Sequence, residues 1–245
     1  METGHRHHLA TGAVRAKARR VISDTWQSQA NLSLFLVLII LLGFVFPAMG
    51  FARDDFRLYS CLGFTLMLIS GTAIAWGHRK LLVLAGFVSS ATIAVLWMNL
   101  LTPTRTLEIW ANGWAIAAIL VIALVLLVQV FGHGRVTHVR IEGAIAAYLL
   151  LGTGWSHAYH LVEILQPGSF TSSAGGMTNP SDWAYYYSFV TLSTVGYGDI
   201  TSIKPMARIL SVGEALTGQL YLAVLIARLV AMEVISWQEE KHHGD

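Results

Sequence analysis

The chain alternates long apolar runs with short polar connections. A helix of about 20 apolar residues crosses the roughly 30 Å hydrocarbon core of a bilayer, so runs of that length predict membrane-spanning helices. Six runs qualify, at residues 32–51, 58–76, 81–101, 110–131, 141–162 and 206–235. We therefore predict an all-α integral membrane protein with six transmembrane helices.

The connections divide these predicted helices into two groups. The first four spans are joined by short connections, which predicts a four-helix transmembrane domain over residues 31–132 after a basic N-terminal segment at 1–30. A second unit covers residues 141–235, and residues 236–245 form a short tail. Because only this tail follows the last span, we expect no ligand-binding domain there.

The connection between the last two spans has a different composition. Residues 165–181 are rich in Gly, Ser, Thr and Pro, which is typical of an external loop. Residues 182–193, DWAYYYSFVTLS, are aromatic and apolar but too short to cross a bilayer. Their length is that of a re-entrant helix, which enters the membrane and returns to the same side.

The motif TVGYGD at residues 194–199 follows this short helix directly. Non-helical backbone is tolerated at membrane depth only where protein buries it or where it lines an aqueous or ionic path. Glycine adopts backbone angles that other residues avoid, so the alternating Gly196 and Gly198 allow successive carbonyl groups to point to one side. The partial negative charge at the C-terminal end of the short helix would stabilise a nearby cation. The motif therefore predicts a row of oxygen ligands for a cation.

The order of span, short helix, TVGYGD motif and span resembles the pore of the potassium channel superfamily, in particular bacterial-type six-transmembrane channels. The resemblance implies an outer helix at 141–162, a pore helix at 182–193, a selectivity filter at 194–199 and an inner helix at 206–235. It also implies passive K⁺ permeation with no cofactor and no enzymatic activity. The residues implied to form the ion-binding filter are Thr194, Val195, Gly196, Tyr197 and Gly198, with K⁺ at the carbonyl groups of the first four.

The resemblance also implies an assembly and a set of supporting residues. Each chain supplies one strand of the carbonyl ring, so a homotetramer within the lipid bilayer is implied. Asp199, Tyr186 and Tyr187 are expected to support the filter from behind. Some relatives carry a carboxylate four residues before the filter, where this chain has Val190.

Two residues of the last span stand out. Glu214 is an ionisable group inside a membrane span, which makes it a functional candidate. It is expected to support the filter by bonding Thr191 or Ser193. The alternatives are a structural contact between helices and pore lining. Gly218, one turn later, is either a gating hinge or a point of close packing.

The fourth run, residues 110–131, contains no charged residue. Voltage-gated relatives place Arg or Lys at every third position of this helix, because only charge that crosses the field couples opening to voltage. The chain departs from that pattern, so we expect a channel that is not steeply voltage-gated.

Three polar residues recur every three positions near the outer end of the fifth span: His157, His160 and Glu163. This spacing suits a metal site or a sensor of external pH. It equally suits side chains that only solvate the end of a helix.

Composition and charge agree with a membrane location. Apolar residues make up 55% of the chain, charged residues only 12%, and the mean hydropathy is +0.58. Most Lys and Arg residues lie in the N-terminal segment and in connections on one side of the six spans, which predicts cytoplasmic termini, with a bacterial inner membrane as the expected location. Such a distribution gives no basic face for nucleic acid. The single cysteine, Cys61, excludes an intrachain disulfide.

Other functions were weighed against these features. A nonselective cation channel and a subunit of a K⁺ uptake transporter would use similar pore chemistry. A membrane enzyme would need a clustered nucleophile and base or a metal motif such as HExxH, and the sequence has neither.

Overall fold

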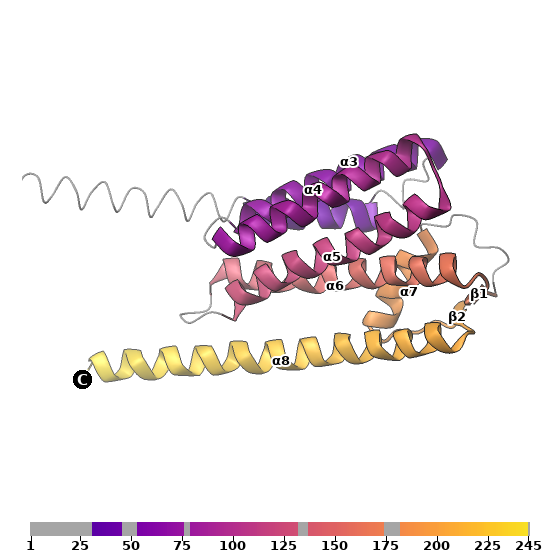
Figure 1. The fold of residues 1–245 in the computed structure, drawn as a ribbon. Helices are drawn as coiled ribbons and strands as arrows, with labels where there is room; N and C mark the ends of the chain where they lie inside the picture. Colours follow the sequence, from indigo (N-terminus) through magenta and orange to yellow (C-terminus); the bar gives the residue numbers. More distant parts are fainter. Residues whose placement is uncertain (1–30, 46–52, 76–78, 132–136, 174–181, 245) are drawn as a thin grey trace, which may run out of the picture.

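The computed structural model describes residues 31–45, 53–75, 79–131, 137–173 and 182–244, and Figure 1 shows their arrangement. The predicted N-terminal segment at 1–30 lies outside the described residues, as do residues 46–51 of the first apolar run. Residues 174–181 of the expected external loop also lie outside them.

Most of the described residues are helical. An apolar helix, Asn31–Val45, ends in a π-helical segment, η1 (Leu41–Val45). The longer helices are α3 (Arg53–Ile74), α4 (Arg79–Leu101), α5 (Arg105–Val130), α6 (His138–Leu165) and α8 (Pro205–Gly244). A short helix, α7 (Asp182–Leu192), lies between two short strands, β1 (Phe170–Ser172) and β2 (Ile200–Ser202).

Four helices of the described chain are long and apolar enough to cross a membrane: Arg57–Ile74, Arg79–Leu101, Arg105–Val130 and Pro205–Val234. They coincide with the second, third, fourth and sixth predicted spans. The fifth predicted span corresponds to α6, which has 28 residues but a more polar sequence. The structure therefore supports a helical membrane protein, while the full count of six spans stays a prediction.

The core of the molecule lies where α5 packs against α6. Ile119, Ile122 and Leu126 of α5 are buried, and Ala146 and Ala147 of α6 are buried opposite them. Small residues such as alanine let two helix backbones approach closely, which favours packing inside a membrane. In Figure 1, α3 and α4 lie on one side of this pair and α8 lies on the other.

The short helix α7 lies between α6 and α8 in Figure 1 and packs against both. The chain leaves α6, forms β1, enters α7, returns through residues 193–199 to β2, and then begins α8. The inner helix is longer than expected, because α8 continues without a break to Gly244 through most of the predicted tail. The segment 194–199 therefore lies between a short supporting helix and the start of a long one.

Candidate functional site

The C-terminal end of α7 turns the chain directly into the TVGYGD segment. The Ser193 N–H donates to the Phe189 carbonyl at 3.1 Å, and the Thr194 N–H donates to the Thr191 carbonyl at 2.9 Å. The Val195 N–H reaches back to Val190 at 3.0 Å. These bonds occupy carbonyl groups that a helix end would otherwise leave unpaired, and they fix where the segment begins.

The backbone of the segment alternates in handedness. Thr194, Gly196 and Gly198 have φ angles of 59°, 55° and 77°, whereas Val195 and Tyr197 between them do not adopt positive φ. Left-handed φ is easy for glycine and costs other residues roughly 1–2 kcal/mol. Alternation of this kind turns successive carbonyl groups toward one side, which is the arrangement that an ion-coordinating strand needs.

The outer end of the segment is held by Asp199 and the strand pair. Strand β1 pairs antiparallel with β2, with Phe170 opposite Ser202. The Ser173 N–H donates to the Asp199 carbonyl at 2.8 Å, and the Tyr186 hydroxyl of α7 donates to the Asp199 carboxylate at 2.8 Å. The predicted supports Asp199 and Tyr186 thus contact each other directly.

Tyr187, the third predicted support, lies on a different face of α7. Its hydroxyl lies 2.7 Å from the Ser211 hydroxyl of α8. Its ring packs edge-on against Tyr159 of α6 and Phe170 of β1, with centroids 5.0 and 5.2 Å apart. An aromatic cluster therefore joins the outer ends of α6, α7 and α8 and limits how far α7 can move.

The inner end of the segment contacts α8. The Gln219 side-chain amide donates to the Thr194 hydroxyl at 3.2 Å. One residue earlier, a Cβ atom at Gly218 would overlap the Leu192 carbonyl oxygen at the end of α7. Close packing therefore requires glycine at position 218; a hinge role there stays a prediction, and α8 is helical throughout this region.

Glu214 is fully buried, with 0% of its side chain exposed, between α6, α7 and α8. One carboxyl oxygen lies 2.5 Å from the Tyr159 hydroxyl and the other lies 2.5 Å from the Ser188 hydroxyl. The prediction that Glu214 bonds Thr191 or Ser193 was therefore wrong. The face of α7 turned toward α6 and α8 carries Ser188, whereas the Ser193 hydroxyl donates to its own helix at 2.6 Å.

The polar series at the outer end of α6 does not converge on one point. His157 contacts Asn112 at 2.9 Å, and His160 contacts Glu108 at 3.1 Å. Glu163 accepts backbone N–H groups of the β1 loop, the shortest from Gly168 at 2.7 Å. Within the part of the chain that the structure describes, no three His, Cys, Asp or Glu side chains are placed to hold a metal ion.

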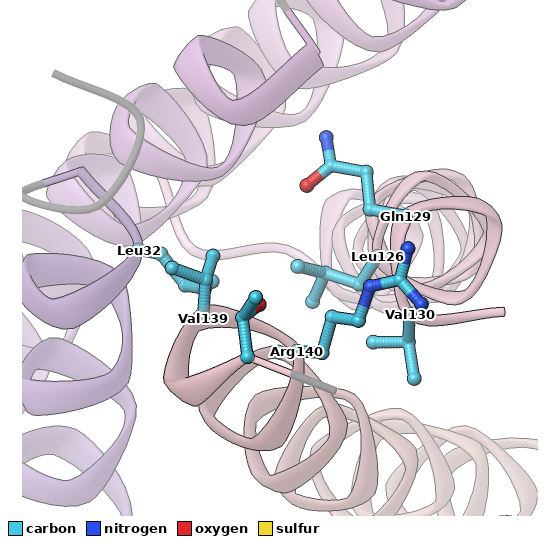
Figure 2. A pocket seen from close by; sticks show the side chains of 8 residues that line it. Leu32, Leu126, Gln129, Val130, Val139 and Arg140 are labelled. Carbon is cyan, nitrogen blue, oxygen red and sulfur yellow. The ribbon is translucent and has the colours of Figure 1, made fainter. Parts of the chain in front are cut away.

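A cavity of about 180 Å³ lies at the other end of α6, away from the segment (Figure 2). Its lining combines apolar residues with three polar ones, Gln129, Thr137 and Arg140. Arg140 also contacts the Met232 sulfur of α8, with Nη1 and Sδ 3.3 Å apart. The cavity therefore lies between the C-terminal end of α5 and the N-terminal end of α6, and none of its lining residues belongs to the TVGYGD segment.

Sequence reasoning missed three contributors to the site. Ser188 and Tyr159 carried no pattern that paired them with Glu214, because the contact depends on how α7 tilts between two other helices. The bond from Gln219 to Thr194 was not predicted either, because it follows from the path of the chain after α7. A buried glutamate nonetheless predicts polar partners in general, since it cannot remain unpaired.

Comparison with known proteins finds a family model that matches one part of the chain. Residues 144–234, from α6 through most of α8, match the model of a family described as ion channel. No solved structure matches the chain.

Three curated relatives are potassium channels by name. Two pore potassium channel c of Oryza sativa subsp. japonica is 40% identical over 93 residues, which is 38% of this chain and 18% of that protein. Two-pore potassium channel 4 of Arabidopsis thaliana is 42% identical over 66 residues, 27% of this chain and 23% of that protein. Inward rectifier potassium channel Kirbac3.1 of Paramagnetospirillum magnetotacticum is 34% identical over 88 residues, 34% of this chain and 26% of that protein.

The matched segments thus span between 18% and 26% of the length of these relatives. The similarities are to ion channels, and they support the potassium channel superfamily for the matched residues. Together with the apolar helices, they support an integral membrane protein that transports ions.

Proposed function

We propose that this protein is a subunit of a K⁺-selective channel, which passes K⁺ passively through a filter formed by residues 194–199 of four identical chains. The observation that carries the proposal is the alternating positive φ of Thr194, Gly196 and Gly198. Carbonyl groups turned to one side by this alternation replace the water around a dehydrated K⁺ ion. K⁺ is the transported ion and not a resident cofactor.

The individual residues of the site have separate roles in this proposal. Thr194, Val195, Gly196 and Tyr197 supply the carbonyl oxygens, and Gly198 lets the strand continue outward. Asp199, Tyr186, Tyr187 and Glu214 support the filter from behind. This division is favoured by the hydrogen bond from Tyr186 to Asp199 and by the link from Tyr187 to α8.

Four chains are needed because each chain supplies one strand of the filter. The exposure of the site in one chain supports this assembly, since Val195 and Tyr197 are 52% and 73% exposed. On α8, Ile209 and Leu220 are 69% and 62% exposed. Neighbouring subunits and lipid would cover these apolar side chains.

We further propose six membrane spans with both termini in the cytoplasm, as the positions of Lys and Arg favour. The helices Asn31–Val45 and α6 would then be the first and fifth spans. A bacterial inner membrane stays our prediction of the location. Opening is only weakly voltage-dependent in this proposal, because α5 has no charged residue after Arg105 and Glu108 in its first turn.

The proposal is tested by ion flux from liposomes that contain the purified protein. A K⁺ gradient should produce rapid flux and an equal Na⁺ gradient should not. Gly196→Ala should either abolish the K⁺ flux or let Na⁺ pass as well, because alanine at a φ of 55° costs roughly 1–2 kcal/mol. Equal K⁺ and Na⁺ flux through the unmodified protein would instead favour a nonselective cation channel.

A further inference from the structure

The hydroxyl group of Ser188 lies between two acceptors. Its oxygen is 2.7 Å from the Gly152 carbonyl of α6 and 2.5 Å from the Glu214 carboxyl of α8. A serine hydroxyl has one proton to donate and two lone pairs that accept. A backbone carbonyl only accepts, so the proton between Ser188 and Gly152 must come from Ser188.

The two short contacts of the Ser188 hydroxyl need two protons, and Ser188 supplies only one. If Ser188 donates to Gly152, the short contact between Ser188 and Glu214 requires a proton on the glutamate. If Ser188 donates to Glu214 instead, two oxygens face each other at 2.7 Å with no proton between them. The Tyr159 hydroxyl fills the other side by donating to the second carboxyl oxygen.

The surroundings favour the uncharged form of the carboxyl group. Glu214, Ser188 and Tyr159 are each 0% exposed. Among the described residues, no Lys, Arg or His lies within ion-pair distance of Glu214. The titratable groups near it are tyrosines, namely Tyr148 and Tyr159 of α6 and Tyr187 of α7. An ionised carboxylate there would be a buried charge without a counter-ion, which is costly.

We infer that Glu214 is a protonated, neutral carboxylic acid that positions the pore helix. Its proton is donated to Ser188, Ser188 donates to Gly152, and Tyr159 donates to Glu214. Each proton in this series of hydrogen bonds is used once, and the series links α6, α7 and α8 without a buried charge. Glu214 is thus a positioning residue for the filter, which begins six residues after Ser188; this role rests on the proposed channel function.

The acid proton has a direct spectroscopic signature. A protonated carboxyl group absorbs in a C=O stretching region separate from that of a carboxylate. Infrared difference spectra between the unmodified protein and Glu214→Gln in liposomes at neutral pH should show a carboxylic acid band lost in the variant. Loss of carboxylate bands instead would overturn the inference.

Glu163→Gln is the matched control. Glu163 accepts three backbone N–H groups, from Gly168, Ser169 and Phe170, and has no acceptor to which it would donate a proton. Its replacement should remove carboxylate bands and leave the carboxylic acid band unchanged. If the acid band disappeared in Glu163→Gln, it would belong to Glu163 and the assignment to Glu214 would fail.

Ser188→Ala provides a second test of the proton arrangement, which holds even if Glu214→Gln does not fold. Ser188→Ala removes the acceptor of the acid proton, so the carboxylic acid band should shift to higher frequency; an unshifted band would contradict the arrangement.

The positioning role is tested by K⁺ flux. Where Glu214→Gln folds, it should keep K⁺ flux, because its amide donates to Ser188 and its carbonyl accepts from Tyr159. Glu214→Leu should lose most of that flux, and equal flux in both variants would contradict a positioning role.

The spectrum and the flux also separate the two proposals. A carboxylic acid band in a protein that conducts no K⁺ would refute the channel function and leave the protonation of Glu214 standing. Selective K⁺ flux in a protein that lacks the band would refute only the protonation.

Discussion

Gly218 of α8 lies directly against the C-terminal end of α7. Alanine normally stabilises a helix relative to glycine by about 1 kcal/mol. At position 218, however, the added Cβ would overlap the Leu192 carbonyl oxygen, which is part of the backbone and cannot rotate away. Overpacking of this kind costs about 1–3 kcal/mol, so the clash outweighs the gain in helix propensity.

We therefore expect Gly218→Ala to lower the thermal stability of the protein in detergent. Gly213→Ala is the matched control, since a Cβ atom there would lie 3.5 Å from the Trp155 ring, an ordinary contact. The control should be as stable as the unmodified protein or slightly more so. Equal stability of the two variants would contradict the packing described for Gly218.

At the residue scale, the sequence revealed the site but not its contacts. Gly196 and Gly198 indicated left-handed backbone because glycine alone adopts it freely. Thr194 adopts the same conformation with a φ of 59°, and nothing in its chemistry predicts that, since the surrounding structure imposes it. The partners of Glu214 were likewise beyond prediction, because helical spacing fixes a face and not the helix that will cover it.

Among the elements, the first helix makes an unexpected contact with the pore helix. Gly43 in the π-helical segment η1 leaves space for the Tyr185 hydroxyl, and a Cβ atom there would overlap it. Phe44 packs edge-on against Tyr185 and Phe189, with centroids 6.0 and 5.2 Å apart. Single π-helical turns within helices are frequent at functional sites. The first helix thus contacts α7, which leads directly into the TVGYGD segment.

We expect Gly43→Ala to displace Tyr185 and to destabilise the protein by about 1–3 kcal/mol, with a change in K⁺ flux. The Phe189 ring restricts rotation of the Tyr185 ring, because the two ring centroids are only 4.6 Å apart. Gly86→Ala is the control, since a Cβ atom at Gly86 would meet nothing within 4 Å. If both variants matched the unmodified protein in stability and flux, the contact between Gly43 and Tyr185 would contribute to neither.

The uncharged body of α5 leads to a prediction about gating. Each elementary charge that crosses the membrane field contributes about 2.3 kcal/mol per 100 mV, and a steep sensor moves about 12 to 16 charges per tetramer. Between Ile109 and Val130 the helix has no charged side chain to move. Current recordings over a wide voltage range should therefore give an effective gating charge of at most a few; a value near 12 would contradict this prediction.

At the scale of elements, the hydrophobic pattern predicted the helices well and the small elements poorly. The short helix expected at 182–193 is α7, Asp182–Leu192. Four long apolar runs became helices of spanning length and composition. Strands β1 and β2 have only three residues each, too few for any periodicity to appear, so their pairing was not predicted. The polar side chains of α6 face neighbouring helices, which a count of apolar residues does not detect.

The whole molecule exposes a large apolar surface along α8. Only 11% of the membrane-spanning part of α8 is buried within the chain. The buried positions Ala207, Glu214 and Gly218 form one stripe that faces α6 and α7, and the remaining faces are open. Val195 and Tyr197 of the neighbouring segment are also exposed, and in the proposed tetramer other subunits would cover this side.

We expect the purified protein to be a tetramer in mild detergent. The measurement is native mass spectrometry, in which four chains of 26.8 kDa should appear together. Conduction by a species shown to be a monomer or a dimer would contradict the assembly, because fewer than four strands cannot close the ring of carbonyl groups.

The central claim is that the alternating backbone of residues 194–198 selects K⁺. The most direct measurement is the reversal potential of currents through the reconstituted protein, with K⁺ on one side of the bilayer and Na⁺ on the other. Carbonyl groups spaced for dehydrated K⁺ should move the reversal potential far toward the value set by the K⁺ gradient. A reversal potential near zero in the unmodified protein, with measurable current in both directions, would contradict the account.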